Sequence, residues 1–208
     1  MGIPVLILGE SGSGKSTSLR NFKPDEVAVF NVAGKPLPFR NKFTNICNGA
    51  TYTQIRGSLS KGNFKRYVID DSQYLLCFEF FDKANEKGYD KFTSMALNFY
   101  DLIKFVVQKT PDDCIVYFLH HTEYTADGRI KAKTIGKMLD EKLTVEGLFS
   151  IVLLCQTDGT EHRFITQSDG NSTAKSPMEM FPLSIDNDLA RVDETIRDYY
   201  NLNDKGEK

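Results

Sequence analysis

The stretch that decides the fold is IPVLILGESGSGKST, residues 3–17. Its first six residues form a continuous apolar run, which predicts a strand buried on both faces. The rest matches the P-loop pattern G-x4-G-K-[ST]. We expect a helix to follow the loop to about Phe22, because Pro24 would stop it there. A buried strand, a glycine-rich loop and a helix in this order predict an α/β unit at the N-terminus.

The loop has the composition of a phosphate-binding site. Its glycines let backbone N–H groups converge on phosphate oxygens, and the following helix adds the positive end of its dipole. Lys15 supplies a charge for the β- and γ-phosphates, and Ser16 can ligate Mg²⁺. A chance match is disfavoured because a strand precedes the loop and a helix follows it. The residues predicted to bind the nucleotide are Gly9, Glu10, Ser11, Gly12, Ser13, Gly14, Lys15, Ser16 and Thr17.

A short apolar run at residues 67–69 ends in two aspartates, Asp70 and Asp71. A carboxylate at the end of a strand completes a P-loop site, because it holds Mg²⁺ directly or through water. We assign the metal role to Asp70 and a catalytic role to Asp71, which would orient the attacking water. This register is open by one residue. The alternative is that the aspartates cap a helix that starts near Ser72.

Another apolar run, residues 114–119, ends in His120 and His121. A polar side chain at the end of such a strand can contact the γ-phosphate or its water and report the nucleotide state to the next loop. A neutral imidazole can do this, and its charge is tunable near neutral pH. We favour His121 over His120 for this role. The alternative is a pair of polar residues where a strand meets solvent.

Strands and helices alternate along the chain, which predicts a mostly parallel sheet with helices on both faces. The expected fold class is therefore α/β, a P-loop NTPase core. Residues 148–156 and 162–166 predict an antiparallel hairpin at one edge of the sheet. Helical spacing predicts amphipathic helices over residues 92–107 and 189–200. We expect a loop at residues 34–42 and a polar segment with a turn at Asp127-Gly128 over residues 122–133. One domain over residues 1–185 and a C-terminal helix with a frayed tail over residues 186–208 are also expected.

Composition limits the classes of partner. The 208 residues contain 26 Lys and Arg against 28 Asp and Glu, so nucleic-acid binding would need a local basic patch. No apolar run approaches the ~18 residues of a membrane span, so we expect no membrane partner. The four cysteines lie far apart without a C-x-x-C pair, and the N-terminus lacks the basic region of a signal peptide. A reduced, cytoplasmic protein is expected.

Several segments belong to one pattern: the P-loop and residues 69–72, 118–123, 133–142, 164–166, 173–177 and 180–181. Together they resemble a known family, the phage-encoded ATP-binding proteins of the RecA-like P-loop class. Some members of this family are implicated in single-strand DNA annealing and recombination. The resemblance spans residues 3–182 and implies a RecA-like core, ATP and Mg²⁺ as ligands, and the bacterial host cytoplasm. It also allows the family's Asp-Ser pair to align with Asp71 and Ser72.

The resemblance implies a role for Lys175, which precedes Ser176-Pro177. In RecA-like ATPases a lysine or arginine near the end of the core often reaches the γ-phosphate of a neighbouring subunit. If Lys175 acts in this way, hydrolysis needs a homo-oligomer. The alternative is a surface lysine in a loop.

A basic run follows the predicted histidine strand. No acidic residue lies between residues 128 and 139, so the segment is suited to holding a single-stranded DNA backbone. The alternative is a solvated loop and helix face, the usual fate of such a run. The candidate DNA-binding residues are Arg129, Lys131, Lys133 and Lys137.

Residues 27–32 predict a second strand, and the sequence departs from RecA-like proteins just after it. Many of them carry a catalytic glutamate there, whereas residues 30–35 read FNVAGK. Hydrolysis is therefore expected to be slow, or Asp71 or Glu10 replaces that glutamate.

The favoured function is a Mg²⁺-dependent ATPase that acts on single-stranded DNA in phage-type recombination, annealing or replication. Its partners would include phage single-strand-binding or recombination proteins. One alternative is a non-catalytic ATP-binding accessory subunit. Another is a small-molecule or nucleotide kinase, although no arginine cluster suits the lid of such an enzyme. A GTPase is disfavoured because the N-K-x-D signature is missing.

Overall fold

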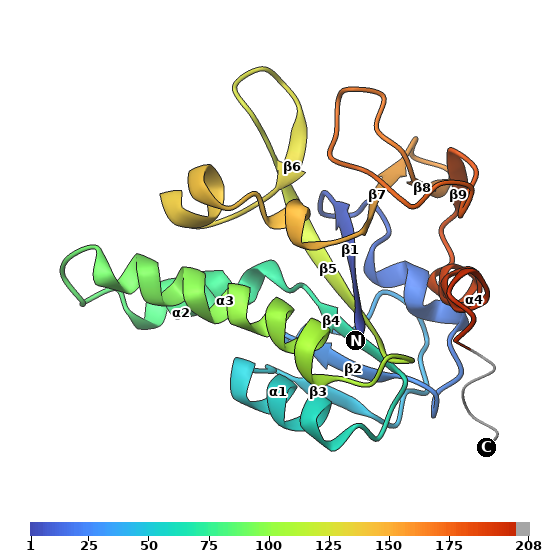
Figure 1. The fold of residues 1–208 in the computed structure, drawn as a ribbon, viewed down its shortest axis with the longest axis horizontal. Helices are drawn as coiled ribbons and strands as arrows, with labels where there is room; N and C mark the ends of the chain where they lie inside the picture. The colour runs from blue at the N-terminus through green and yellow to red at the C-terminus, as the bar shows by residue number, and fades with distance from the viewer. Residues whose placement is uncertain (203–208) are drawn as a thin grey trace.

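The structure, a computed structural model, describes residues 1–202 apart from the side chains of residues 140 and 141. The tail predicted beyond Leu202 lies outside the described residues. The fold is α/β with a mostly parallel sheet, as predicted (Figure 1). The sheet of the described chain has nine strands: β1 (Ile3–Gly9), β2 (Ala28–Asn31), β3 (Ile46–Asn48), β4 (Arg66–Asp70), β5 (Ile115–Tyr124), β6 (Ile130–Ala132), β7 (Ile151–Thr157), β8 (His162–Ile165) and β9 (Ser184–Asp186).

The strands follow the order β3-β2-β4-β5-β1-β7-β8-β9, and β6 pairs with the C-terminal end of β5. All pairs from β3 to β7 are parallel. The predicted hairpin is the antiparallel pair β7–β8, with β9 outside it at the edge. The helical segments are η1 (Ser16–Asn21), α1 (Tyr52–Lys61), α2 (Gln73–Asp82), α3 (Asp90–Lys109), η2 (Met138–Lys142), η3 (Val145–Leu148) and α4 (Leu189–Tyr199).

Helices cover both faces of the sheet, and the buried strands alternate between two hydrophobic clusters. On β1, Leu6 and Leu8 pack into one cluster with α1, α2 and α3, whereas Val5 and Ile7 pack into the other with η1 and α4. Figure 1 shows these two groups of helices on opposite sides of the sheet. Side chains of a strand point alternately to its two faces, so a strand covered on both needs a continuous apolar run. This explains the sequence pattern of residues 3–8.

Two predicted elements differ in the structure. The segment after the P-loop is a 3-10 helix that ends at Asn21, ahead of Pro24. The polar segment over residues 122–133 has the predicted turn at Asp127-Gly128, but the strands on either side of it were not predicted: β5 continues to Tyr124 and pairs with β6 in a β-hairpin. This part of β5 is polar because it projects beyond the core, so an apolar run did not reveal it. The hairpin extends at the top of Figure 1.

The C-terminal helix is joined to the core. Leu189, Val192 and Ile196 of α4 are buried in the cluster that contains β1 and β5, so α4 covers the sheet together with η1. The division predicted at residue 185 stays a prediction. Among the helices of residues 1–202, none combines the length and apolarity that a membrane crossing requires.

A buried cluster of charged residues links α4 to β4 and β5. Asp193 is 1% exposed, and its Oδ2 lies 2.6 Å from Nε of Arg66 on β4 and 2.7 Å from Nε of Arg197. Its Oδ1 accepts a 2.9 Å hydrogen bond from the hydroxyl of Tyr117 on β5. Removing one member of a buried ion pair leaves uncompensated charge, which is strongly destabilising.

We predict that Asp193→Ala lowers the free energy of unfolding by about 3–5 kcal/mol, because two guanidinium groups lose their carboxylate. Urea unfolding followed by circular dichroism measures the change. Glu194→Ala, at an exposed position of the same helix, is the matched control and should change stability by less than about 0.5 kcal/mol. Equal effects of the two substitutions would contradict the assigned role of Asp193.

Candidate active site

The P-loop joins β1 to η1 and needs glycine at two positions. Gly12 and Gly14 have φ angles of 81° and 103°, a region that other residues rarely adopt. A Cβ on Gly14 would also lie 2.8 Å from Nδ1 of His162 on β8. The glycine spacing of the motif therefore follows from backbone geometry and from the close approach of β8.

Two side chains from the β7–β8 hairpin hold the loop in place. The carbonyl of Ser13 accepts hydrogen bonds from Sγ of Cys155, at 2.9 Å, and from Nδ1 of His162, at 2.8 Å. Burial raises the pKa of Cys155 to about 11, which keeps this thiol protonated as a donor. Nothing in the sequence pattern marked His162 as a site residue, since only the folded hairpin brings it to the P-loop.

Lys15 lies folded against its own loop. It is 5% exposed, and its Nζ donates 2.8 Å hydrogen bonds to the carbonyls of Gly9 and Glu10. Burial lowers the pKa of this lysine, partly offset by the negative charges of Asp71 and Asp70. A buried ammonium group that is hydrogen-bonded to carbonyls has already lost its surrounding water. It can therefore contact an anion without further desolvation.

The predicted metal residues meet. The hydroxyl of Ser16 donates a 2.8 Å hydrogen bond to Oδ1 of Asp70, whose carboxylate stands at the end of β4. Asp70 is 3% exposed, and burial raises its pKa to about 6. Mg²⁺ prefers hard oxygen ligands and is usually bound by one or two protein groups together with phosphates and water. Ser16 and Asp70 fit this type of site, and no cluster of three metal-binding side chains occurs among the described residues.

Asp71 makes a different set of contacts. Its Oδ1 accepts a 3.1 Å hydrogen bond from Nε2 of His121, and its Oδ2 lies 3.0 Å from Nζ of Lys35. Burial alone would raise the pKa of Asp71, but these two partners outweigh it and lower the pKa to about 2. The backbone φ of Asp71 is 59°, a strained value for a residue with a side chain. Both aspartates thus face partners in other elements, in place of capping α2.

The two histidines have separate roles. His120 is fully buried, and burial lowers its pKa to about 4, so its ring is neutral. It donates from Nε2 to the carbonyl of Lys133 and accepts at Nδ1 from the hydroxyl of Ser72. His121 lines the P-loop cavity and is hydrogen-bonded to Asp71. His121 therefore belongs to the candidate site, whereas His120 links neighbouring segments of the fold.

These groups surround a cavity of about 280 Å³ at the carboxyl ends of β1, β4 and β5. It is lined by P-loop residues, both aspartates, His121, His162, Asn31, Lys35 and the prolines Pro36 and Pro38. Ligands of open α/β sheets bind at this end of the strands. Asn31, Lys35 and His162 were not among the predicted site residues.

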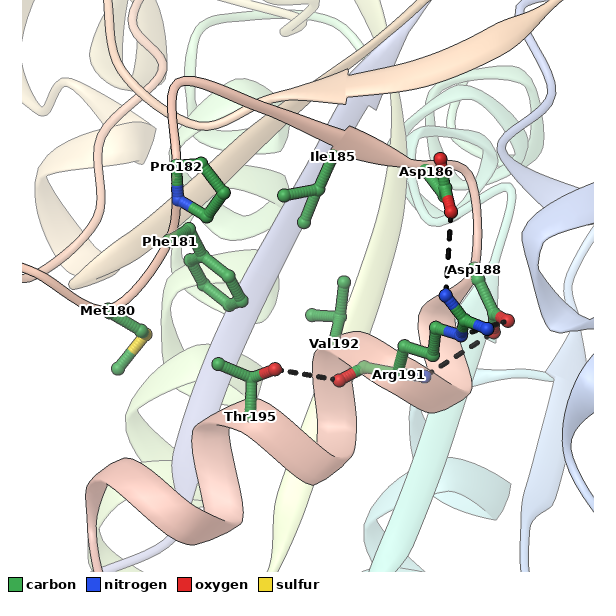
Figure 2. A pocket seen from close by; sticks show the side chains of 9 residues that line it. All are labelled: Met180, Phe181, Pro182, Ile185, Asp186, Asp188, Arg191, Val192 and Thr195. Carbon is green, nitrogen blue, oxygen red and sulfur yellow. Dashed lines mark hydrogen bonds and ion pairs between the residues drawn. The ribbon is translucent and has the colours of Figure 1, made fainter.

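A cavity of about 380 Å³ lies elsewhere, between the segment around β9 and α4 (Figure 2). Its wall is largely apolar, with Phe181, Pro182 and Ile185 on one side. Its cation, Arg191, lies 3.5 Å from Asp186 and 3.7 Å from Asp188. An apolar wall with a neutralised arginine does not suit a polyphosphate, so the P-loop cavity is the candidate site.

The remaining predicted residues lie apart from this cavity. Lys175 is half-buried in a backbone bridge to Val152 and does not line the P-loop cavity. In the β5–β6 hairpin, Arg129 pairs with Asp127 at 2.8 Å, and Lys131 pairs with Glu123 at 3.3 Å. The hairpin is therefore less positive than the run of residues 128–139 indicated.

Lys133 and Lys137 are exposed beyond β6. The hairpin also contacts the P-loop directly, because the hydroxyl of Tyr124 donates a 2.6 Å hydrogen bond to Oε1 of Glu10.

No protein-family model matches the chain, and none of the curated proteins compared with it is a match.

We predict that Asp70→Asn stabilises the metal-free protein above pH 6. Because the folded-state pKa of about 6 exceeds the ordinary value of 3.8, the wild-type protein loses stability as pH rises between these values. The difference between these two pKa values corresponds to at most about 3 kcal/mol of stability. Urea unfolding in EDTA at pH 8 should show a gain of about 1–3 kcal/mol for the variant.

The same comparison near pH 4 is the control for this prediction. There the carboxyl group of Asp70 is protonated in the folded protein, so the difference between the two proteins should shrink to a few tenths of a kcal/mol. An asparagine variant that is no more stable than wild type at pH 8 would contradict the buried, uncompensated carboxylate.

Proposed function

We propose that the protein is a Mg²⁺-dependent ATPase whose turnover responds to single-stranded DNA. The observation that carries the proposal is the convergence of Lys15, the Ser16–Asp70 pair and the Asp71–His121 pair on one cavity. These groups come from the P-loop, the end of β4 and β5, three segments that are far apart in the sequence. Phosphoryl transfer needs positioning and charge stabilisation more than covalent chemistry, and this set supplies both.

Each residue has a role set by its position. The backbone of residues 10–15 would cradle the phosphates, and Lys15 would place its charge on the β- and γ-phosphates. Ser16 and Asp70 would hold Mg²⁺, which neutralises charge on the phosphate oxygens when it is bound. His121 would stand beside the terminal phosphate, its ring oriented by Asp71. The resemblance to phage RecA-like proteins favours ATP over other nucleotides.

The link to DNA rests on the β5–β6 hairpin. β5 carries His121 within the site and continues as the hairpin that presents Arg129 and Lys131. The Tyr124–Glu10 hydrogen bond joins the same hairpin to the P-loop. A strand of DNA bound along this hairpin would therefore contact an element that reaches the phosphates. Partners such as phage recombination proteins, a homo-oligomer and a trans-acting Lys175 belong to the same proposal.

A second candidate function is a nucleotide-binding accessory subunit without turnover. Both carboxylate oxygens of Asp71 are engaged by His121 and Lys35. A general base needs a free lone pair and a pKa near the working pH. The segment that follows β2 has no carboxylate, and the cavity is lined there by Asn31, the last residue of β2, and by Lys35. An accessory subunit of this kind would bind the nucleotide but hydrolyse it slowly or not at all.

The proposed ATPase predicts hydrolysis that depends on Mg²⁺ and on the P-loop. Lys15→Ala should lower kcat by about 100-fold or more, because it removes a positive charge aimed at the transferred phosphoryl group. Phosphate release is measured at saturating ATP, with and without a single-stranded oligonucleotide. Lys42→Ala, at an exposed position outside the cavity, is the control. Tight ATP binding without turnover under every condition would favour the accessory subunit.

The DNA proposal predicts a salt effect. The triple variant Arg129→Ala, Lys131→Ala, Lys133→Ala should bind a single-stranded oligonucleotide more weakly. The slope of log K against log salt should fall by about 2, since each phosphate contact to a single strand contributes about 0.7. Fluorescence anisotropy over a salt titration measures both quantities.

A matched variant separates the hairpin from general loss of charge. Lys61→Ala, Lys104→Ala, Lys109→Ala removes three exposed lysines from α1 and α3, and it should leave the slope unchanged. If both triple variants change the slope equally, or neither does, the hairpin is not the DNA-binding element.

A further inference from the structure

Lys35 brings a second lysine to the P-loop cavity. Its Nζ lies 3.0 Å from Oδ2 of Asp71 and 5.0 Å from the centre of the Tyr74 ring. The side chain is 60% exposed, so its ammonium stands at the mouth of the cavity and is free of tight packing. Its charge also contributes to the lowered pKa of Lys15, behind the larger effect of burial, which places the two lysines within electrostatic range.

The backbone of Lys35 is held in place by a buried amide. Asn31, the last residue of β2, is 2% exposed and donates 2.6 Å and 2.8 Å hydrogen bonds to the carbonyl of Lys35 and to Oδ1 of Asn48. Its own carbonyl accepts from the backbone N–H of Gly34, whose φ is 67°. A buried amide with satisfied hydrogen bonds fixes local geometry. These hydrogen bonds therefore fix the backbone of Lys35, whereas its side chain is exposed to solvent.

The position of Lys35 relates it to the terminal phosphate. In a P-loop site the lysine and the metal-binding serine mark the β- and γ-phosphates. Asp70 bonds to that serine, and the adjacent Asp71 bonds to Lys35. Lys35 thus approaches from the wall that carries the two aspartates, whereas Lys15 approaches from the loop. Lys35 also lies in the segment in which many RecA-like proteins carry a catalytic glutamate.

Resting on the function proposed above, we propose that Lys35 contacts the γ-phosphate and makes the site selective for nucleoside triphosphates over diphosphates. In this role Asp71 is an anchor that holds Lys35 and His121 beside the cavity. Magnesium-bound ATP brings additional negative charge on its terminal phosphate, which the exposed ammonium of Lys35 can contact. Magnesium-bound ADP lacks that group, and Lys35 then stays on Asp71. A charge-assisted hydrogen bond to phosphate is the type of interaction that discriminates between the two.

The test compares the affinities for two nucleotides in the full-length protein. Isothermal titration calorimetry with Mg²⁺ measures Kd for ADP and for AMP-PNP, a non-hydrolysable ATP analogue. Lys35→Met removes the charge and keeps the length of the side chain. We expect it to weaken AMP-PNP binding at least tenfold and ADP binding less than threefold. Lys35→Arg should recover part of the lost affinity, and Lys42→Met, in the same connection between β2 and β3, should change neither Kd.

The outcomes separate this inference from the proposed function. Equal weakening of both nucleotides by Lys35→Met, or an unchanged Kd for both, would overturn the role in the discrimination of triphosphates while leaving nucleotide binding intact. Wild-type protein that binds neither nucleotide would overturn the proposed function, and the inference with it. Circular dichroism of each variant before titration shows that a lost affinity does not come from unfolding.

Discussion

The parallel pairing of β5 between β1 and β4 is the constraint on which the site depends. It sets Gly9 opposite His121 and places Asp70 at the neighbouring strand end. The P-loop, the aspartates and the histidine meet because the carboxyl ends of parallel strands share one edge. A slip of one residue in either pairing would turn alternate side chains to the other face. The same slip would bury polar groups in the hydrophobic clusters, so the core enforces the register that the site requires.

Two adjacent carboxylates experience opposite environments at this edge. Burial raises the pKa of Asp70 to about 6, whereas hydrogen bonds from His121 and Lys35 lower that of Asp71 to about 2. Neighbouring carboxylates with divergent environments are suited to different roles. Asp70 is buried without a full complement of cationic partners, so the metal-free protein bears a cost that a bound cation would offset. The negative charge of Asp71 is already balanced by its partners His121 and Lys35. This residue is therefore better suited to anchoring them than to accepting a proton.

Much of the fold could be predicted from the sequence, because local patterns determine it. The apolar run of residues 3–8, the helix α3 and the β7–β8 hairpin follow from periodicity and turn residues. Lys35 and His162 could not be predicted as site residues. Each reaches the site through a contact that the fold alone creates, such as the one between His162 and Ser13, 149 residues apart. The ion pair between Lys131 and Glu123 was missed for a related reason, since the two residues face each other only when residues 122–132 form paired strands.

The most direct test of the account is a crystal structure of the protein with Mg²⁺ and AMP-PNP. The account predicts Mg²⁺ bound to the hydroxyl of Ser16 with Asp70 in its coordination sphere. It also predicts Nζ of Lys15 and Nζ of Lys35 within hydrogen-bond distance of the γ-phosphate, from opposite sides. A nucleotide bound away from the P-loop, or no nucleotide at saturating concentration, would contradict the central claim. A γ-phosphate contacted by Lys15 while Lys35 remains on Asp71 would contradict the selectivity mechanism alone.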